Sequence, residues 1–192
     1  MARIRTFLAI DLGKSIRENL VHLKEDLGPL LPEVNWVEPE SIHLTLLFLG
    51  EVNDRELLPV CRATQKAAQK TPSFTLSLAG MGCFPNLRRP RVLWIDIDKG
   101  RDALIGLHAE LETPLMELGC YRREERLYTP HVTLGRLKSD PPDGTLSELV
   151  GKYQDHRAGQ VEVKELLVMS SEMKSSGPVY TVMSRAKLAG RG

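Results

Sequence analysis

The chain has 192 residues, of which 42% are hydrophobic and 27% are charged, proportions that are ordinary for a soluble globular protein. Its net charge of +1 is too small for a protein that coats nucleic acid through general basicity, and its longest apolar run, around residues 43–50, is far too short to cross a bilayer. The length suits one domain, or two small lobes that share a core.

The chain opens with a predicted strand and helix. Residues 3–11 are expected to form a strand, because Asp11 interrupts the apolar stretch of MARIRTFLAIDL and no signal-peptide cleavage site follows it. Ser15 and Glu18 have the spacing of a capping box, and leucines recur at helical spacing after them. The sequence therefore predicts a helix over 15–27.

Strands and helices continue to alternate along the rest of the chain. Strands are expected at 34–37 and 42–49, and a second helix runs from the N-cap Asn53, with Glu56 three residues on, to about Lys70. The later elements are a strand at 73–79, a Gly-, Pro- and Arg-rich loop at 80–90, a strand at 92–97, a helix at 104–118 ending at Gly119, a strand near 127–134, a short helix at 145–153, and two strands near 160–170 and 179–187. Hairpins mixed with helical crossovers predict an α+β fold with largely antiparallel sheets.

Several common kinds of site are missing from the sequence. Neither G-x-x-x-x-G-K-[ST] nor G-x-G-x-x-G occurs, so no phosphate loop or dinucleotide fingerprint is present. Cys61, Cys83 and Cys120 are widely spaced and form no CxxC pair, which argues against a zinc site and a disulfide framework. We expect free thiols in a reducing cytoplasm.

Arginines gather in two places that could form local anion-binding patches. Arg88, Arg89 and Arg91 lie in NLRRPR, and the second group flanks residue 131 and comprises Arg122, Arg123, Arg126 and Arg136. Charge alone favours the simpler interpretation, a solvated loop surface.

The motif H-x-T occurs twice, in HLTLLFLG at 43–50 and in HVTLG at 131–135. In a strand, residues two apart share a face, so His43 and Thr45 point one way while their leucine neighbours point to the core. His131 and Thr133 repeat the pattern 88 residues later. If the two halves of the chain pack about a pseudo-twofold axis, these four polar side chains meet at one site.

Paired histidines suit a reaction that needs one base and one acid near neutral pH, because both protonation states of imidazole are then accessible. Hydroxyls beside them can donate to the oxygens of an anion, so a phosphodiester is the natural substrate. Metal ligation is less well supported, because two histidines give too few ligands and no acidic or cysteine partner recurs. A serine hydrolase is weaker still, since no nucleophile elbow occurs. Of the other histidines, His22 and His156 are expected to be solvated and His108 to be packed against its helix.

The two motifs resemble those of the two-histidine (2H) phosphoesterases, and the nearest group is the RNA 2′,3′-cyclic phosphodiesterases, also called LigT-like or 2′-5′ RNA ligases. The resemblance covers nearly the whole chain: RTFLAIDL, the W-x(6)-H-L-T-L stretch, FPNLRRPRVLW, YTPHVTLGR and VKELLVMSSEMKSSGPVY are all similar to it. It implies one domain over 1–192 with two pseudo-symmetric lobes, antiparallel sheets flanking a central cleft and helices on the outside. It also implies metal-independent hydrolysis of a terminal ribose 2′,3′-cyclic phosphate to a 2′-phosphomonoester.

The resemblance assigns a role to each motif residue. His131 would be the general base that activates water, and His43 the general acid that protonates the departing 3′ oxygen. Thr45 and Thr133 would hold the non-bridging phosphate oxygens.

Two further residues match the family's pattern outside the H-x-T motifs. Arg136 would add a charge-assisted contact to the phosphate. Simple alternation puts it on the face opposite His131, so it reaches the site only if the chain bends at Gly135. Phe84 matches a position that can stack on the terminal base, or it packs as a loop aromatic, whereas Trp36 and Tyr128 are expected in the core.

Other functions remain open at this stage. One is 2′-5′ ligation of a cyclic-phosphate end to a 5′ hydroxyl, which is the same chemistry run backward. Another is a non-catalytic module that binds RNA ends or nucleotides, although both histidines and both threonines are intact. The expected partners are RNA with 2′,3′-cyclic phosphate ends or small cyclic nucleotides; no cofactor, metal or membrane is implied, and a monomer is expected.

Overall fold

The computed structural model describes residues 3–175 and 177–190. The nine strands in this part of the chain form one twisted sheet, and every pairing between the named strands is antiparallel. Eight of them follow the order β7-β4-β5-β6-β3-β1-β8-β9, and β2 adds to β6. The fold is therefore α+β with a largely antiparallel sheet, as the sequence predicted.

The first half of the chain supplies five strands, two α-helices and one short 3-10 helix. They are β1 (Arg3–Ile10), α1 (Gly13–Leu27), β2 (Val34–Trp36), η1 (Pro39–Ser41), β3 (Leu44–Asn53), α2 (Asp54–Ala68), β4 (Phe74–Phe84) and β5 (Val92–Lys99) at the boundary with the second half. The second half contains α3 (Arg101–Glu117), β6 (His131–Leu137), α4 (Thr145–Lys152), β7 (Arg157–Val163), β8 (Glu165–Lys174) and β9 (Gly177–Lys187).

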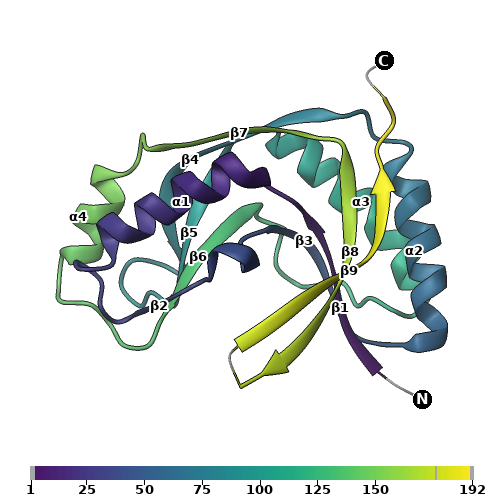
Figure 1. Cartoon of the computed structure of the whole chain (residues 1–192), viewed down its shortest axis with the longest axis horizontal. Helices are drawn as coiled ribbons and strands as arrows, with labels where there is room; N and C mark the ends of the chain where they lie inside the picture. The colour runs from purple at the N-terminus through teal and green to yellow at the C-terminus, as the bar shows by residue number, and fades with distance from the viewer. Residues whose placement is uncertain (1–2, 176, 191–192) are drawn as a thin grey trace.

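The sheet is symmetric about its middle. From the centre outward, β6, β5, β4 and β7 mirror β3, β1, β8 and β9. Helices cover each half at opposite ends of the molecule, with α1 and α4 over one and α2 and α3 over the other (Figure 1). The predicted arrangement of two pseudo-symmetric lobes, with helices outside, is confirmed.

The helices cross between the two halves. β1 lies in one half, yet α1, which follows it, packs against β7 in the other. Likewise α3 follows β5 but packs beside α2, across the molecule. Each lobe is thus completed by a helix whose preceding strand belongs to its neighbour.

Leucine stripes explain why these helices bind the sheet. Ile16, Leu20, Leu23 and Leu27 form the buried face of α1, and Leu104, Leu107, Leu111 and Leu115 form that of α3. Burying one such side chain contributes roughly 1.5–3 kcal/mol. No helix in the described ranges is long and apolar enough to span a membrane.

Several predicted boundaries are wrong. α1 begins at Gly13, whose backbone N–H donates to the Asp11 side chain, so Ser15 and Glu18 lie inside the helix and form no capping box. β4 continues to Phe84 because β5 pairs with it to that residue, which shortens the predicted loop at 80–90. β6 starts only at His131.

The end of the chain contains three strands where two were predicted. The predicted strand near 160–170 is interrupted at Lys164. The part before it, β7, pairs with β4 at one edge of the sheet, and the part after it, β8, pairs with β1 and β9 near the other edge. β8 and β9 continue as a long hairpin that projects away from the helices (Figure 1). The turn predicted at 175–178 includes Ser176, which lies outside the described residues.

Candidate active site

The two H-x-T motifs meet at the centre of the sheet. β3 and β6 are neighbours, and Leu44 pairs with Val132 in antiparallel register. Counting one residue from this pair sets His43 across from Thr133, and Thr45 across from His131. Leu44 and Val132 are completely buried on the other face.

Both imidazoles are held by the same backbone contact. His43 Nδ1 lies 2.7 Å from the carbonyl oxygen of Ser41, and His131 Nδ1 lies 2.7 Å from that of Thr129. A carbonyl can only accept, so Nδ1 carries the proton in each ring. The neutral tautomer therefore leaves the lone pair on Nε2 of both histidines.

Aromatic rings pack around His131. The Phe84 ring meets it edge-on with 4.9 Å between centroids, and the Trp94 ring lies 6.1 Å away. Trp94 can lie there because Gly82, opposite it on β4, has no side chain: a Cβ would come within 2.5 Å of the indole. Phe84 thus lies beside His131, as the sequence predicted, whereas the position of Trp94 at the site was not predicted.

A second aromatic group surrounds His43. The rings of Phe7 and Tyr180 lie 5.0 and 5.2 Å from the imidazole, and Phe7 also contacts Phe48. None of these three aromatic residues was predicted for the site. Alternation along β1 could have indicated Phe7, since it is two residues from Ala9, the partner of Thr45; Tyr180 depends on the unpredicted pairing of β8 with β1.

Burial lowers the pKa of His43. The bond to the Ser41 carbonyl opposes this shift, and the nearby Arg17 guanidinium adds to it. His43 is therefore neutral near pH 7 in the free protein, and its imidazolium, once formed, is a stronger acid than an exposed one.

Burial also lowers the pKa of His131, but its electrostatic surroundings differ. The Thr129 carbonyl and the Asp96 carboxylate oppose the shift, while Arg136 reinforces it. Asp96 pairs with His131 across the strands, and its Oδ1 accepts from Arg101 and, at 2.7 Å, from the backbone N–H of Ile97. Both histidines thus lie near a guanidinium, and His131 also lies near a fixed carboxylate, that of Asp96.

A bulge brings Arg136 to the same face as His131. Thr133 pairs with Trp94 and Gly135 with Leu93, so Leu134 is an extra residue and the alternation changes phase. Leu134 and Gly135 are both buried, and Arg136 is exposed. The bend that the sequence required of Gly135 is present.

Gly135 is needed where β2 crosses the bulge. A Cβ there would lie 2.4 Å from Cγ1 of Val34 and 3.0 Å from the carbonyl oxygen of Asn35. The first motif has the same bulge: Thr45 pairs with Ala9 and Leu47 with Leu8, so Phe48, with 53% of its surface exposed, occupies the position that corresponds to Arg136.

The other predicted positions are peripheral to the site. Trp36 and Tyr128 both pack against the core, as predicted, and the Tyr128 hydroxyl donates to the Thr45 carbonyl at 3.0 Å. The exposed His22 pairs with Glu25, and His108 stacks on Tyr128. His156 is half-buried against Tyr153, so the prediction that it is solvated is wrong.

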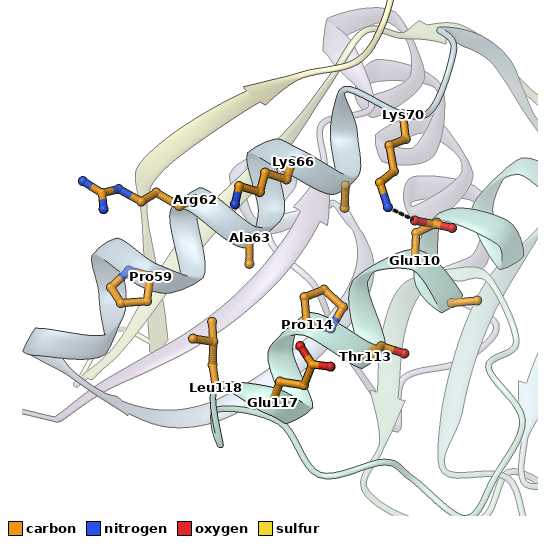
Figure 2. A pocket seen from close by; sticks show the side chains of 12 residues that line it. Pro59, Arg62, Ala63, Lys66, Lys70, Glu110, Thr113, Pro114, Glu117 and Leu118 are labelled. Carbon is orange, nitrogen blue, oxygen red and sulfur yellow. Dashed lines mark hydrogen bonds and ion pairs between the residues drawn. The ribbon is translucent and has the colours of Figure 1, made fainter.

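Two features elsewhere do not contribute to this site. A groove of about 650 Å³ lies between α2 and α3 and is lined by residues of both charges. Figure 2 shows two of them, Lys70 and Glu110, pointing toward each other, and they pair at 3.0 Å. No H-x-T residue lines the groove. Within the described ranges no three His, Cys, Asp or Glu side chains gather closely enough to hold a metal ion, and the three cysteines are free thiols.

Two neutral imidazoles with free Nε2 atoms, two hydroxyls and one guanidinium thus share an open face. Such a set can bind an anion and move two protons, one to each side of it. A comparison with known proteins identifies the family of the chain. The family model described as LigT-like phosphoesterase matches residues 10–94 and again 95–180.

The chain belongs to the LigT-like phosphoesterase family. The two matches divide the chain within β5, and each contains one of the two H-x-T strands, β3 in the first and β6 in the second. A relative from Aquifex aeolicus, named RNA 2′,3′-cyclic phosphodiesterase, is 34% identical over 99% of this chain and 100% of its own. One of the same name from Methanothermobacter thermautotrophicus is 32% identical over 97% of this chain and 100% of its own.

Solved structures of other proteins have the same fold. A Thermus thermophilus protein superimposes with a TM-score of 0.82 at 28% identity, covering 98% of this chain and 100% of its own. The E. coli LigT complex with 3′-AMP gives a TM-score of 0.79 at 29% identity, covering 97% and 98%.

Proposed function

We propose that the protein hydrolyses the 2′,3′-cyclic phosphate at an RNA end to a 2′-phosphomonoester, without a metal, by acid–base catalysis between two histidines. The observation that carries this proposal is the pair of imidazoles on one open face, each with Nδ1 bonded to a backbone carbonyl and Nε2 free. The name shared by full-length relatives supports the choice of substrate.

In the proposed reaction, Nε2 of His131 takes a proton from water as the water oxygen bonds to phosphorus. The bond between phosphorus and the 3′ oxygen breaks, and protonated His43 gives its proton to that oxygen. The anionic substrate favours the imidazolium of His43, which is otherwise disfavoured by burial and Arg17. Proton exchange with solvent restores both rings.

The charges beside the histidines support this division of roles. The Asp96 carboxylate favours the imidazolium that forms when His131 accepts a proton. Arg17 favours proton release from His43. A general base and a general acid need these opposite influences.

The remaining site residues would hold the substrate. We assign the non-bridging phosphate oxygens to the hydroxyls of Thr45 and Thr133 and to the guanidinium of Arg136. Phe84 would stack on the terminal base, a contact that tolerates any base.

The direct test is to incubate the protein with a 2′,3′-cyclic mononucleotide and identify the product. We expect the 2′-phosphate, full activity in EDTA, and a bell-shaped dependence of kcat/KM on pH. A 3′-phosphate product would reject the assigned leaving group, and activity lost in EDTA and restored by metal would reject the mechanism.

Ligation uses the same groups with an RNA 5′ hydroxyl in place of water. Incubation of paired RNA halves, one ending in a cyclic phosphate and one in a 5′ hydroxyl, measures how much 2′-5′ linkage forms. The three free thiols suit a reducing compartment, and we assign the activity to the cytoplasm.

A further inference from the structure

We propose that the loop between β4 and β5, residues 85–91, binds the phosphodiester backbone of the RNA upstream of the reacting end. This inference rests on the proposed function and extends it from one nucleotide to a strand. Arg88 and Arg89 are the contacting residues.

The loop is joined directly to the site. It begins after Phe84, whose ring lies 4.9 Å from that of His131. It closes where the Arg91 N–H donates to the Phe84 carbonyl at 2.7 Å. Arg88 and Trp94 also line one open hollow of about 670 Å³, so a surface leads from the ring beside His131 to the loop.

The two arginines are presented to solvent by a fixed backbone. Oδ1 of Asn86 accepts from the backbone N–H groups of Arg88 and Arg89, at 3.0 and 3.1 Å. Both arginines are exposed, and neither guanidinium has a hydrogen-bond or ion-pair partner among the described residues. Arg91 differs, because it pairs with Asp140 at 2.7 Å.

The charges of the two lobes show which way a strand would leave. In the lobe that contains β5 and β6, Arg136 follows the bulge and lies across from Val92 at the start of β5. In the second lobe, which contains β1 and β3, Phe48 occupies the corresponding position. At the far edge of that second lobe, Arg5 lies across from Glu51, and Glu172 and Lys174 pair at 3.8 Å. Phosphates are attracted to the side on which Arg88, Arg89 and Arg136 have no carboxylate partner among the described residues.

Single-stranded RNA is the partner that fits this surface. A cationic loop continuous with aromatic rings is how proteins follow a backbone while stacking a base. A mononucleotide lacks upstream phosphates, so its binding should not depend on the loop.

The test compares R88A/R89A with the unchanged protein on two substrates, a hexanucleotide ending in a 2′,3′-cyclic phosphate and a cyclic mononucleotide. We expect KM for the hexanucleotide to rise about tenfold with kcat unchanged, and both constants for the mononucleotide to stay the same. The slope of log KM against log salt should fall by about 0.7 for each phosphate that the variant no longer neutralises.

R62A/K66A is the matched control, because it removes the same charge from α2, at the groove away from the site. The proposal is overturned if R88A/R89A leaves KM for the hexanucleotide unchanged, raises KM equally for both substrates, or has no larger effect than the control. If the unchanged protein turns over neither substrate, the proposed function fails instead. Fluorescence anisotropy of a hexanucleotide ending in a 3′-phosphate, with and without R88A/R89A, then tests the loop alone.

Discussion

At the scale of single residues, the two histidines differ in their neighbours and not in their geometry. Each Nδ1 is 2.7 Å from a carbonyl two residues back in the chain. The tautomer is thus set by the backbone, and charged side chains remain free to tune each ring separately. In the proposed mechanism, this division is what would let one strand motif serve as the acid in one copy and as the base in the other.

Replacing either histidine should abolish activity. His43→Ala and His131→Ala should each lower kcat/KM for a cyclic mononucleotide by about a factor of 10³ or more, because either change removes one of the two proton transfers. Circular dichroism should show both variants folded. His22→Ala, which changes an exposed histidine, is the control and should keep full activity; near-normal turnover by folded His43→Ala or His131→Ala would refute the mechanism.

The carboxylate beside His131 should shape the pH profile. Asp96→Asn removes a charge that raises the pKa of His131, so that pKa should fall further below its usual value. The base must be neutral to act, so the acid limb of kcat/KM should move to lower pH. The weaker base should also reduce the plateau, by about threefold.

Asp98→Asn is the control for this measurement, since Asp98 lies on the same strand but pairs with Arg157 at 3.3 Å. Its acid limb should not move. An acid limb that moves to higher pH in Asp96→Asn, or one that stays in place, would contradict the role given to this carboxylate.

At the scale of elements, the β-bulge decides which side chains join the site. It changes the phase of alternation after Thr133, so that Arg136 shares the open face with His131. Strict alternation predicts the opposite, and only a known pairing between β5 and β6 reveals the extra residue. Local periodicity therefore identified the motif residues but not their neighbours on adjacent strands, such as Trp94 and Asp96.

Gly135→Ala should disturb this bulge. The new Cβ would lie 2.4 Å from Val34 and 3.3 Å from Cα of Trp36, so β2 must move away from β6. We expect the free energy of unfolding to fall by about 1–3 kcal/mol, and KM to rise because Arg136 is displaced. Urea titration and steady-state kinetics measure the two effects.

Gly106→Ala is the matched control in the exposed part of α3, where a Cβ meets nothing within 4 Å. Alanine is the better helix former, so this variant should be more stable by about 0.5–1 kcal/mol with unchanged KM. If Gly135→Ala behaved in the same way, the close approach of β2 would not matter.

At the scale of the whole molecule, the sequence predicted the class of fold and its two lobes but not how the lobes are joined. Leucine spacing and strand patterns are local, and they located α1 and α3 within a few residues. The crossing of these helices, and the split of the last strands between two edges of the sheet, depend on contacts between distant segments. The pairing of Leu44 with Val132, which brings the motifs together, is another such contact.

The shared sheet and crossed helices should make the two lobes unfold together. Since α1 and α3 each pack in the lobe opposite their preceding strand, neither lobe has a complete core alone. Scanning calorimetry should show one transition whose calorimetric and van't Hoff enthalpies agree. Two resolved transitions, or a calorimetric enthalpy well above the van't Hoff enthalpy, would show that the lobes unfold independently.

The symmetric strand order also bears on how such a protein could arise. A chain of about half this length, paired with a copy of itself about a twofold axis, would place two H-x-T strands side by side and exchange a helix with its partner. Duplication and fusion of its gene would give the order of the six inner strands, β4-β5-β6-β3-β1-β8, with the axis between β3 and β6. After fusion the two copies could diverge, so that Phe48 lies beyond the bulge of one motif and Arg136 beyond that of the other. A homodimer could not make that distinction, because any substitution in one half would appear in both.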